Sequence, residues 1–493
     1  MTDAHDVRAE PRLLVDGRLT EASGGGSFDN VDPTTEQVLG QTADATAADM
    51  EAAIAAARRA FDETGWSTDH ALRRRCLEQL HRAAEAHKEE LRAITVAEVG
   101  SPIALTYANQ VDLPIEDLGY WVEQPTRYEY ERWLPERDVF GQPQRRLIRR
   151  EAVGVVGAIT PWNFPLNLNL AKLAPALAAG NTVVLKPAPD TPWSATALGR
   201  MVAEETDIPA GVVNVVASSD HLVGEVLTTD PRVDMITFTG STATGRRIMA
   251  KGAETVKKVF LELGGKSANI VLDDVEDPAA AIGLSAVGVC THAGQGCAIT
   301  TRLLLPRSRY EEFLEVAASM MGSVTYGDPW DGANLQGPVI SARQRERVLG
   351  YIAAGTAEGA RLVLGGGRPA HLPTGYFVEP TLFADVDPKA TIAQEEIFGP
   401  VLAVIAYEDD DDAVRIANDS IYGLSGAVTS ASEERALAVA ARVRTGTLMV
   451  NGGFWNSPDV PFGGYRQSGV GRENGAEGFE EYLEVKAIAL PAR

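Results

Sequence analysis

Residues 152–185 read AVGVVGAITPWNFPLNLNLAKLAPALAAGNTVVL, and this stretch decides the fold. Two short runs rich in β-branched residues, 153–159 and 182–185, flank a segment in which the apolar residues of 168–179 follow helical spacing. Two strands joined through a helix form a right-handed crossover between parallel neighbours. The stretch therefore predicts a parallel sheet that helices cover on both faces.

The same alternation continues along most of the chain. Further strands are expected at residues 212–216, 235–238, 259–263, 270–272, 302–305, 401–406 and 448–450. Helices are expected at residues 47–63, 70 to about 96, 194–205, 245–251, 309–320 and 410–418. Residues 14–18 indicate a strand that turns at Asp16 and Gly17, and residues 126–150 alternate bulky and charged side chains as an exposed hairpin does. We expect an α/β protein in which a doubly wound lobe packs against a second α/β lobe.

The composition excludes several classes of protein. Lys and Arg number 45 against 68 Asp and Glu, and the net charge of −23 disfavours nucleic acid as a partner. Three cysteines, Cys76, Cys290 and Cys297, are too few and too scattered for a disulfide framework, and they predict no metal site. No apolar run approaches the roughly 18 residues of a membrane span, and the N-terminal MTDAHDVRAEPR does not resemble a signal peptide. A cytoplasmic protein without membrane contact is expected.

Two side chains suggest covalent chemistry. Cys297 lies among small residues in AGQGCA (293–298), which would let a substrate approach its thiol, although a free cysteine is more often an inert buried residue. Glu262 lies in the apolar run VFLELGG (259–265), where a carboxylate either faces a cleft or belongs to an ion pair. A thiol nucleophile and a carboxylate that activates water would together support acyl-enzyme chemistry.

The segment FTGSTATG (238–245) leads from an expected strand into an expected helix. Backbone amides at such a helix N-terminus can bind a phosphate. The glycine spacing is not GxGxxG, however, so an ordinary turn is the alternative.

In combination, these residues resemble the aldehyde dehydrogenase superfamily. The motifs that carry the resemblance are PWNFP (161–165), KP (186–187), FTGS (238–241), ELGGK (262–266), GQGC (294–297), EEIFGP (395–400) and PFGG (461–464). They occur in the family's order from about residue 153 to residue 471. The resemblance implies NAD(P)-dependent oxidation of an aldehyde to a carboxylic acid.

The resemblance also implies catalytic roles. Cys297 would form a thiohemiacetal and then a thioester, and Asn163 with the Cys297 backbone amide would hold the oxyanion. Glu262 would activate the water that hydrolyses the thioester. Lys172 and Lys266 match positions near the site whose roles are less settled.

A cofactor site is implied in the same way. Lys186 would contact the adenosine ribose, Ser241 the pyrophosphate, and Gln344 and Glu396 the nicotinamide ribose. The full set of expected cofactor residues is Ile159, Trp162, Lys186, Gly240, Ser241, Gln344, Glu396 and Phe398. For Trp162 and Phe398, plain core packing is an equal alternative.

The chain departs from the family pattern at three places. His292 stands where relatives often carry Asn, and Gly296 precedes the nucleophile where a larger residue is usual. Pro189 replaces a Glu that many NAD-preferring relatives use to bind the ribose hydroxyls, and Asp190 follows it. We expect NAD as the cofactor, with measurable use of NADP.

The substrate tunnel implied by the resemblance is apolar. Its expected residues are Phe164, Leu168, Ala171, Trp455 and Phe462. Because Ala171 stands where relatives often carry Trp, there should be room for a medium-length or bulky apolar aldehyde, aliphatic or aromatic. No Arg is expected there to pair with a carboxylate.

The implied fold has a Rossmann-like cofactor-binding domain at residues 1–126 and 151–263, and a catalytic domain at 264–465. A small β arm for oligomerisation would consist of residues 127–150 and 480–493. A homodimer or homotetramer is expected.

Two other functions compete with this one. A CoA-acylating semialdehyde dehydrogenase would release the thioester to CoA, but such enzymes generally lack the glutamate at the position of Glu262. A ligand-binding protein that kept the fold and lost activity would lack a catalytic group, yet Cys297, Glu262 and Asn163 are all present.

Overall fold

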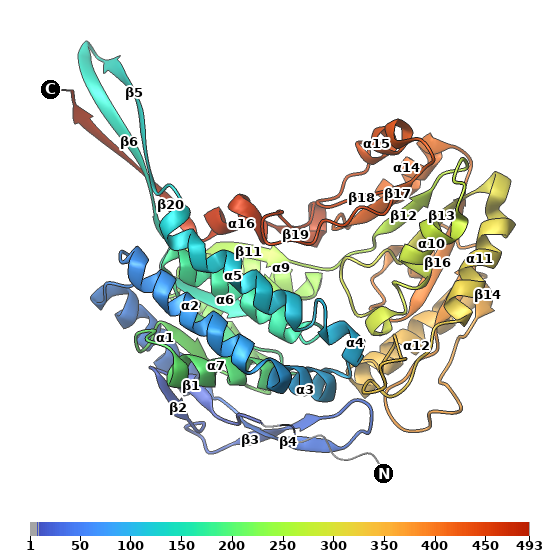
Figure 1. The fold of residues 1–493 in the computed structure, drawn as a ribbon, viewed down its shortest axis with the longest axis horizontal. Coiled ribbons are helices and arrows are strands. Elements are labelled where there is room, and N and C mark those ends of the chain that lie inside the picture. Colours follow the sequence, from blue (N-terminus) through green and yellow to red (C-terminus); the bar gives the residue numbers. More distant parts are fainter. Residues whose placement is uncertain (1–6, 8, 493) are drawn as a thin grey trace.

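Two open sheets, each between layers of helices, form the body of the molecule (Figure 1). The computed structural model describes residue 7 and residues 9–492. Two expectations fall partly outside the described residues. These are the absence of a signal peptide in residues 1–12 and the last residue of the expected arm.

The first sheet is doubly wound. Its order is β19-β11-β10-β7-β8-β9-β1-β2. The parallel strands are β7 (Val155–Ile159), β8 (Thr182–Lys186), β9 (Val213–Val215), β10 (Met235–Thr239) and β11 (Lys258–Glu262). The antiparallel strands at its two edges are β1 (Leu13–Val15), β2 (Arg18–Thr20) and β19 (Gly469–Val470). Because β7 comes first in the chain and lies between β8 and β10, the winding direction reverses there, and such a reversal opens a crevice at the carboxyl ends of the strands.

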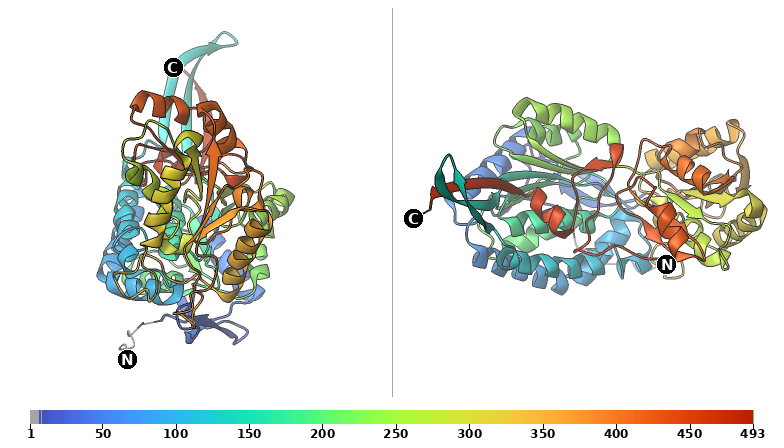
Figure 2. Two further views of the ribbon diagram at one scale, coloured as in Figure 1. Left: turned by 90° about the vertical axis from the view of Figure 1, so that its right-hand side faces the viewer. Right: turned by 90° about the horizontal axis from the view of Figure 1, so that it is seen from above.

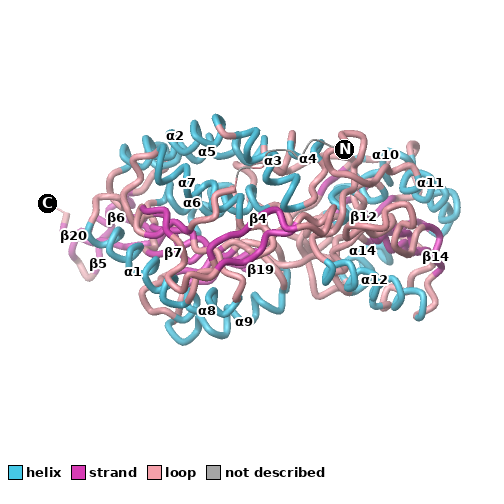
Figure 3. Tube along the Cα trace, turned by 90° about the horizontal axis from the view of Figure 1, so that it is seen from below, coloured by secondary structure: helices cyan, strands magenta, loops and turns pink. Residues whose placement is uncertain are grey.

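Helices cover both faces of this sheet (Figure 3). One layer contains α2 (His70–Ala86), α3 (Lys88–Val99), α5 (Asp112–Arg127), α6 (Pro165–Ala179) and α7 (Trp193–Glu205). The other contains α8 (His221–Thr229) and α9 (Thr242–Gly252), and α1 (Ala47–Glu63) contacts α8.

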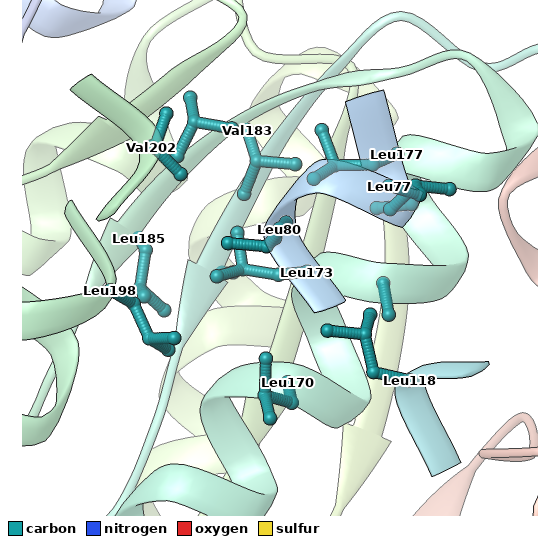
Figure 4. Packing of buried hydrophobic residues seen from close by; sticks show 14 of the residues in the cluster. Leu77, Leu80, Leu118, Leu170, Leu173, Leu177, Val183, Leu185, Leu198 and Val202 are labelled. Atoms are coloured by element: carbon teal, nitrogen blue, oxygen red, sulfur yellow. The ribbon is translucent and has the colours of Figure 1, made fainter. Parts of the chain in front are cut away.

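The core between the first layer and the sheet is aliphatic (Figure 4). Leu80 of α2, Leu118 of α5 and Leu173 of α6 are almost completely buried, and they pack in one cluster with Val183 and Leu185 of β8. Burial of such side chains contributes roughly 1.5–3 kcal/mol each. This core holds α5 and α6 in the positions from which they contribute to the site described below.

The second sheet has the order β14-β15-β16-β13-β12-β17-β18. Its strands are β12 (Ala268–Val271), β13 (Arg302–Pro306), β14 (Arg361–Leu364), β15 (Thr381–Ala384), β16 (Val401–Tyr407), β17 (Gly426–Thr429) and β18 (Met449–Val450). All neighbours are parallel except β14 and β15. Helices α10 (Pro278–Ala286) and α11 (Tyr310–Gly322) lie on one face, and α12 (Ala342–Ala357) and α14 (Asp410–Asn418) on the other (Figure 3).

An arm of three antiparallel strands projects from the body (Figures 1 and 2). Hairpin β5 (Glu131–Val139) and β6 (Gln142–Ala152) pairs with the C-terminal strand β20 (Leu483–Pro491) in the order β20-β6-β5. The expected hairpin and the expected C-terminal strand are thus both present.

The remaining elements are short or peripheral. They are β3 (Ser27–Val31), β4 (Val38–Ala43), α4 (Ile103–Thr106), α13 (Thr391–Gln394), α15 (Glu433–Ala440), α16 (Gly475–Glu481), η1 (Ala253–Thr255), η2 (Thr291–Gly294), η3 (Arg307–Arg309) and η4 (Arg466–Ser468). After the second sheet the chain returns, and β19 joins the edge of the first sheet beside β11. The domain ranges expected from the sequence stay a prediction.

One predicted element was wrong in its extent. The single helix expected from His70 to about Val96 is two helices, because His87 leaves the helical conformation at φ −101° and ψ 17°. Its ring contacts Glu90 Oε2 at 3.0 Å and Glu205 Oε1 at 2.7 Å. The apolar spacing continues on both sides of this residue, so periodicity alone could not reveal the break.

Candidate active site

A cavity of about 630 Å³ lies between the two sheets, and Cys297 lines it. The residue follows η2 in the loop that leads to β13, and its side chain is partly exposed, whereas Cys76 and Cys290 are buried. Loss of water around the sulfur, followed by the charges of Glu396 and Glu262, raises the pKa of the Cys297 thiol well above its usual value. The thiol is therefore protonated at rest and needs a base before it can attack.

The Gly264–Gly265 turn after β11 lets the two lobes approach closely at this loop. A Cβ atom on Gly265 would lie 2.4 Å from the carbonyl oxygen of Cys297, and one on Gly264 would lie 2.4 Å from Glu396 Oε2. The Gly265 amide donates to Glu396 Oε1 at 2.8 Å. A side chain on Gly265 would clash with backbone, and one on Gly264 would displace the Glu396 carboxylate, which explains the Gly-Gly pair of the ELGGK motif.

Asn163 lies beside the same loop and is buried. Its side-chain Nδ2 donates to the carbonyl oxygen of Gln295 at 2.8 Å. Its own carbonyl oxygen lies 3.0 Å from Gln110 Nε2 and 2.8 Å from His292 Nε2. Both Asn163 and Cys297 line the cavity.

Glu262 ends β11 and is 2% exposed. Neither carboxyl oxygen has a hydrogen-bond partner among the described residues. Burial, and next the charge of Glu473, raises the pKa of Glu262 well above its usual value, while Lys172 and Arg472 act in the opposite direction. Glu262 is not among the residues that line the cavity, but Leu263 and Gly264, which follow it, are.

A buried ion pair lies next to Glu262. Lys172 Nζ contacts Glu473 Oε1 at 2.8 Å and Thr237 Oγ1 at 3.3 Å. Glu473 lines the cavity, and the two side chains neutralise each other. Lys266, by contrast, is buried with no partner for Nζ among the described residues, and burial followed by the charge of Arg302 lowers its pKa to about 7.

The carboxyl ends of the first sheet line up at one edge of the cavity. Ile159 pairs with Phe238 and Lys186, and Thr239 pairs with Glu262. Gly240 and Ser241 follow β10 and line the cavity, and Ser241 caps α9 by accepting from the Thr244 amide. Ile159 and Lys186 do not line this cavity.

Lys186 ends β8 and is buried among oxygen atoms. Its Nζ lies 3.4 Å from the carbonyl oxygens of Pro187 and Ser218. Burial lowers its pKa to about 8, against the charges of Asp220 and Asp44. Burial raises the pKa of Asp190, and the charge of Arg343 acts in the opposite direction.

Three further expected cofactor residues meet at the second lobe. Gln344 Nε2 donates to the carbonyl oxygen of Phe398 at 2.8 Å. The rings of Trp162 and Phe398 are perpendicular with centroids 5.4 Å apart. All three line the cavity, as does Glu396, so Trp162 and Phe398 both pack on each other and face the cavity.

The expected substrate residues lie in the same cavity. Phe164, Leu168, Ala171, Trp455 and Phe462 all line it. The rings of Trp455 and Phe462 stack at 5.1 Å, and Phe454, which is 74% exposed, stacks on Trp455 at 6.3 Å.

Sequence reasoning missed several lining residues. Helix α5 contributes Pro114, Asp117, Leu118 and Trp121, and Glu473 and Phe454 also line the cavity. Residues 114, 118 and 121 follow helical spacing, and this signal could have identified α5 and its inner face. Nothing in the sequence pairs that face with Cys297.

Among the described residues, no cluster of three or more His, Cys, Asp or Glu side chains has the arrangement of a metal site. Within the same part of the chain, every helix is too short or too polar to span a bilayer.

The chain is similar to known proteins along almost its whole length. A model of the aldehyde dehydrogenase family matches residues 19–488. A 3-succinoylsemialdehyde-pyridine dehydrogenase from a Pseudomonas species is 42% identical over 490 residues, which are 98% of this chain and 99% of that protein. The crystal structure of aldehyde dehydrogenase KauB from Pseudomonas aeruginosa has a TM-score of 0.94 at 37% identity and covers 99% of this chain and 98% of its own.

A second solved structure is aldehyde dehydrogenase C from Pseudomonas syringae, crystallised as a mutant with NAD⁺ and octanal. It has a TM-score of 0.92 at 40% identity, and 98% of each chain is covered. The predicted fold class is confirmed by these structures, and the predicted enzyme class by the family match. The chain therefore belongs to the aldehyde dehydrogenase family.

Proposed function

We propose that this enzyme oxidises an apolar aldehyde to its carboxylic acid with NAD, by way of a thioester on Cys297 that water hydrolyses. The observation that carries the proposal is the position of the Cys297 thiol in one cavity with Asn163, an apolar wall and the carboxyl ends of the first sheet. Glu262, behind that cavity, has the free carboxyl oxygens that the hydrolytic step requires.

In the first step, the Cys297 sulfur attacks the carbonyl carbon and the carbonyl oxygen becomes an oxyanion. One hydrogen of the Asn163 amide already donates to Gln295, and the second is available for the oxyanion together with the Cys297 backbone amide. Because the pKa of the thiol is raised, a base has to take its proton, and the carboxylates whose charges act on the thiol, Glu396, Glu262 and Glu473, are the candidates.

The residues at the cofactor side fit a dinucleotide. The first-turn amides of α9 behind Ser241 suit a pyrophosphate, and Glu396 Oε2 has no bond to the Gly265 amide and suits a ribose hydroxyl. When bound, NAD supplies the nicotinamide that accepts the hydride. The residues that would hold it are Ile159, Trp162, Lys186, Gly240, Ser241, Gln344, Glu396 and Phe398.

Hydrolysis is assigned to Glu262. A carboxylate with both oxygens free can take the proton of a water molecule that attacks the thioester carbon. The presence of Glu262 favours water over CoA as the acceptor of the acyl group. Formation of the carboxylic acid in the absence of CoA would distinguish hydrolysis from acyl transfer to CoA. The inactive-protein alternative is disfavoured because Cys297 and Asn163 line one cavity and the charge of Glu262 acts on the Cys297 thiol.

The charges around Lys186 favour NAD over NADP. Pro189 removes the acidic residue expected there, but Asp220 and Asp44 both act on the Lys186 ammonium. These carboxylates would repel a 2′-phosphate, as an acidic residue does in dinucleotide folds. The enzyme should also turn over NADP measurably, because the Lys186 ammonium attracts the 2′-phosphate.

An apolar substrate is supported by the aromatic stack and by the charges of the cavity. Asp117 is the charged residue of α5 in the cavity, and it has no cationic partner among the described residues. Burial, followed by the charge of Glu116, raises its pKa to about 6. Arg347 also lines the cavity, but it donates to the carbonyl oxygen of Glu396 on the cofactor side. An anionic substrate would therefore meet repulsion rather than a salt bridge.

We also propose that the enzyme is a homodimer or homotetramer and that it is located in the cytoplasm. The arm leaves β5 and β20 as edge strands, and Trp133 and Val485 on them are exposed. A partner subunit would cover such edges. The free cysteines are compatible with a reducing compartment.

Replacement of the nucleophile tests the central assignment. Cys297→Ala should abolish dehydrogenase turnover, because no neighbouring group can replace the thiol. Cys76→Ala, the matched control at a buried cysteine, should keep turnover largely intact. Turnover is read from the absorbance of NADH, with thermal unfolding as a check of folding; retained turnover in the Cys297 variant would contradict the assignment.

Replacement of the base separates the two chemical steps. Glu262→Gln should slow steady turnover by roughly 10²–10⁴-fold, while rapid mixing still shows up to one hydride transferred per site. In the wild type, steady turnover should fall as the pH drops through the raised pKa of Glu262, because the protonated carboxyl cannot take a proton from water. This acid limb should be absent from the variant. An unchanged steady rate would exclude the role.

The substrate class is tested by comparing aldehydes. The kcat/KM values for hexanal and benzaldehyde should exceed that for succinic semialdehyde, since the carboxylate of the latter meets Asp117. Asp117→Asn should reduce the difference in kcat/KM between succinic semialdehyde and the two apolar aldehydes. A higher kcat/KM for succinic semialdehyde would contradict the apolar assignment.

The cofactor preference is tested with one aldehyde and both dinucleotides. NAD should give the higher kcat/KM. Asp220→Asn should improve NADP relative to NAD, and asparagine can keep the cap that Asp220 makes with the Leu222 amide. A wild-type preference for NADP of about tenfold, or ~1.4 kcal/mol, would overturn the choice.

A further inference from the structure

His292 lies in a strained turn just before the nucleophile. It is 1% exposed, it lines the cavity, and its ring centroid lies 5.2 Å from that of Phe164. Both His292 and Ala293 adopt left-handed backbone conformations, with φ of 53° and 52°. Such conformations cost of order 1–3 kcal/mol each outside glycine, and they persist only where surrounding contacts hold them.

The contacts that hold this turn lead to Asn163. His292 Nε2 lies 2.8 Å from the Asn163 carbonyl oxygen, which can only accept a hydrogen bond, so Nε2 must carry the proton. Nδ1 then has a lone pair, and it has no partner among the described residues. Burial lowers the pKa of His292 to about 4, so the imidazole is neutral at ordinary pH.

Asn163 is also a hydrogen-bond donor to the same turn. Its side-chain amide donates to the Gln295 carbonyl oxygen at 2.8 Å. Gln295 in turn donates from Nε2 to the His292 carbonyl oxygen at 3.2 Å, and its Oε1 accepts from the Ile340 amide at 2.9 Å. Asn163 thus accepts from His292 and donates to Gln295, two bonds that tie it to the loop carrying Cys297.

We propose that His292 is a positioning residue, whose Nε2–H fixes Asn163 against residues 292–295 and so holds the Asn163 amide where the oxyanion forms. The inference rests on the proposed function, in which Asn163 is an oxyanion donor. A displacement of about 1 Å at such a donor can cost on the order of 10²-fold in rate. No charge change is involved, because Nε2 donates in both the neutral and the protonated ring.

The test is a double-mutant cycle read by the NADH burst at saturating aldehyde and NAD. His292→Leu should slow the burst by about tenfold, with the KM for aldehyde and the Kd for NAD unchanged within about twofold. His292→Gln should recover most of the rate, because its amide nitrogen can donate near the position of Nε2. In an Asn163→Ala background, His292→Leu should change the burst by less than about twofold.

Three results would overturn the proposal. One is an equal loss from His292→Leu in both backgrounds, which would mean that His292 acts independently of Asn163. Another is a His292→Leu variant with a higher KM for aldehyde or a higher Kd for NAD but an unchanged rate of the NADH burst. The third is an unaffected burst in Asn163→Ala alone, which would remove the oxyanion role from Asn163 while leaving the roles of Cys297 and Glu262 to their own tests.

Folding is checked by thermal unfolding of every variant. The Asn163 carbonyl oxygen keeps its bond from Gln110 Nε2 in His292→Leu, so it is not left without a partner. If His292→Leu does not fold, Gln110→Leu removes the other donor to the same oxygen. Gln110→Leu should slow the NADH burst in the wild-type background and change it by less than about twofold in the Asn163→Ala background. An equal loss of burst rate in both backgrounds would again contradict the positioning role.

Discussion

The close approach of the Gly264–Gly265 turn to the Cys297 loop is the constraint on which the rest of the site depends. The two glycines follow β11 of the first sheet, and the Cys297 loop leads to β13 of the second sheet. A Cβ on Gly265 would lie 2.4 Å from the Cys297 carbonyl oxygen, while the Gly265 amide binds Glu396. One point of contact therefore brings the nucleophile, Glu262 and Glu396 together. A side chain on Gly265 would clash with the Cys297 backbone at this contact.

Burial at this junction raises the pKa values of the candidate nucleophile and base. Loss of surrounding water is the largest cause of the raised pKa of both Cys297 and Glu262. The neighbouring Lys172–Glu473 pair is neutral as a whole, so it leaves the pKa of Glu262 raised. A thiol that holds its proton at rest and a carboxyl whose pKa is raised suit a reaction in which the thiol loses a proton and the carboxylate accepts one. The same dry environment strengthens the hydrogen bonds that Asn163 makes.

Much of the fold could be predicted from periodicity. The expected helix at residues 47–63 has those bounds, and the strands of both sheets lie within a few residues of their expected places. The helix expected to continue through His87 was wrong, because hydrogen bonds to Glu90 and Glu205 hold a break that leaves the apolar spacing intact. Periodicity reports which face is buried, and it does not report a single residue that leaves the helix.

The sequence by itself determined the α/β class, the identity of the candidate nucleophile and base, and the family to which they belong. Those features depend on short motifs whose residues are neighbours in the chain. Only the tertiary structure decided that Asp117 and Trp121 of α5 line the same cavity as Cys297, that Lys172 pairs with Glu473, and that His292 donates to Asn163. The last two contacts join residues 301 and 129 positions apart, and a local pattern carries no information on such pairs because only the tertiary packing of distant segments brings them into contact.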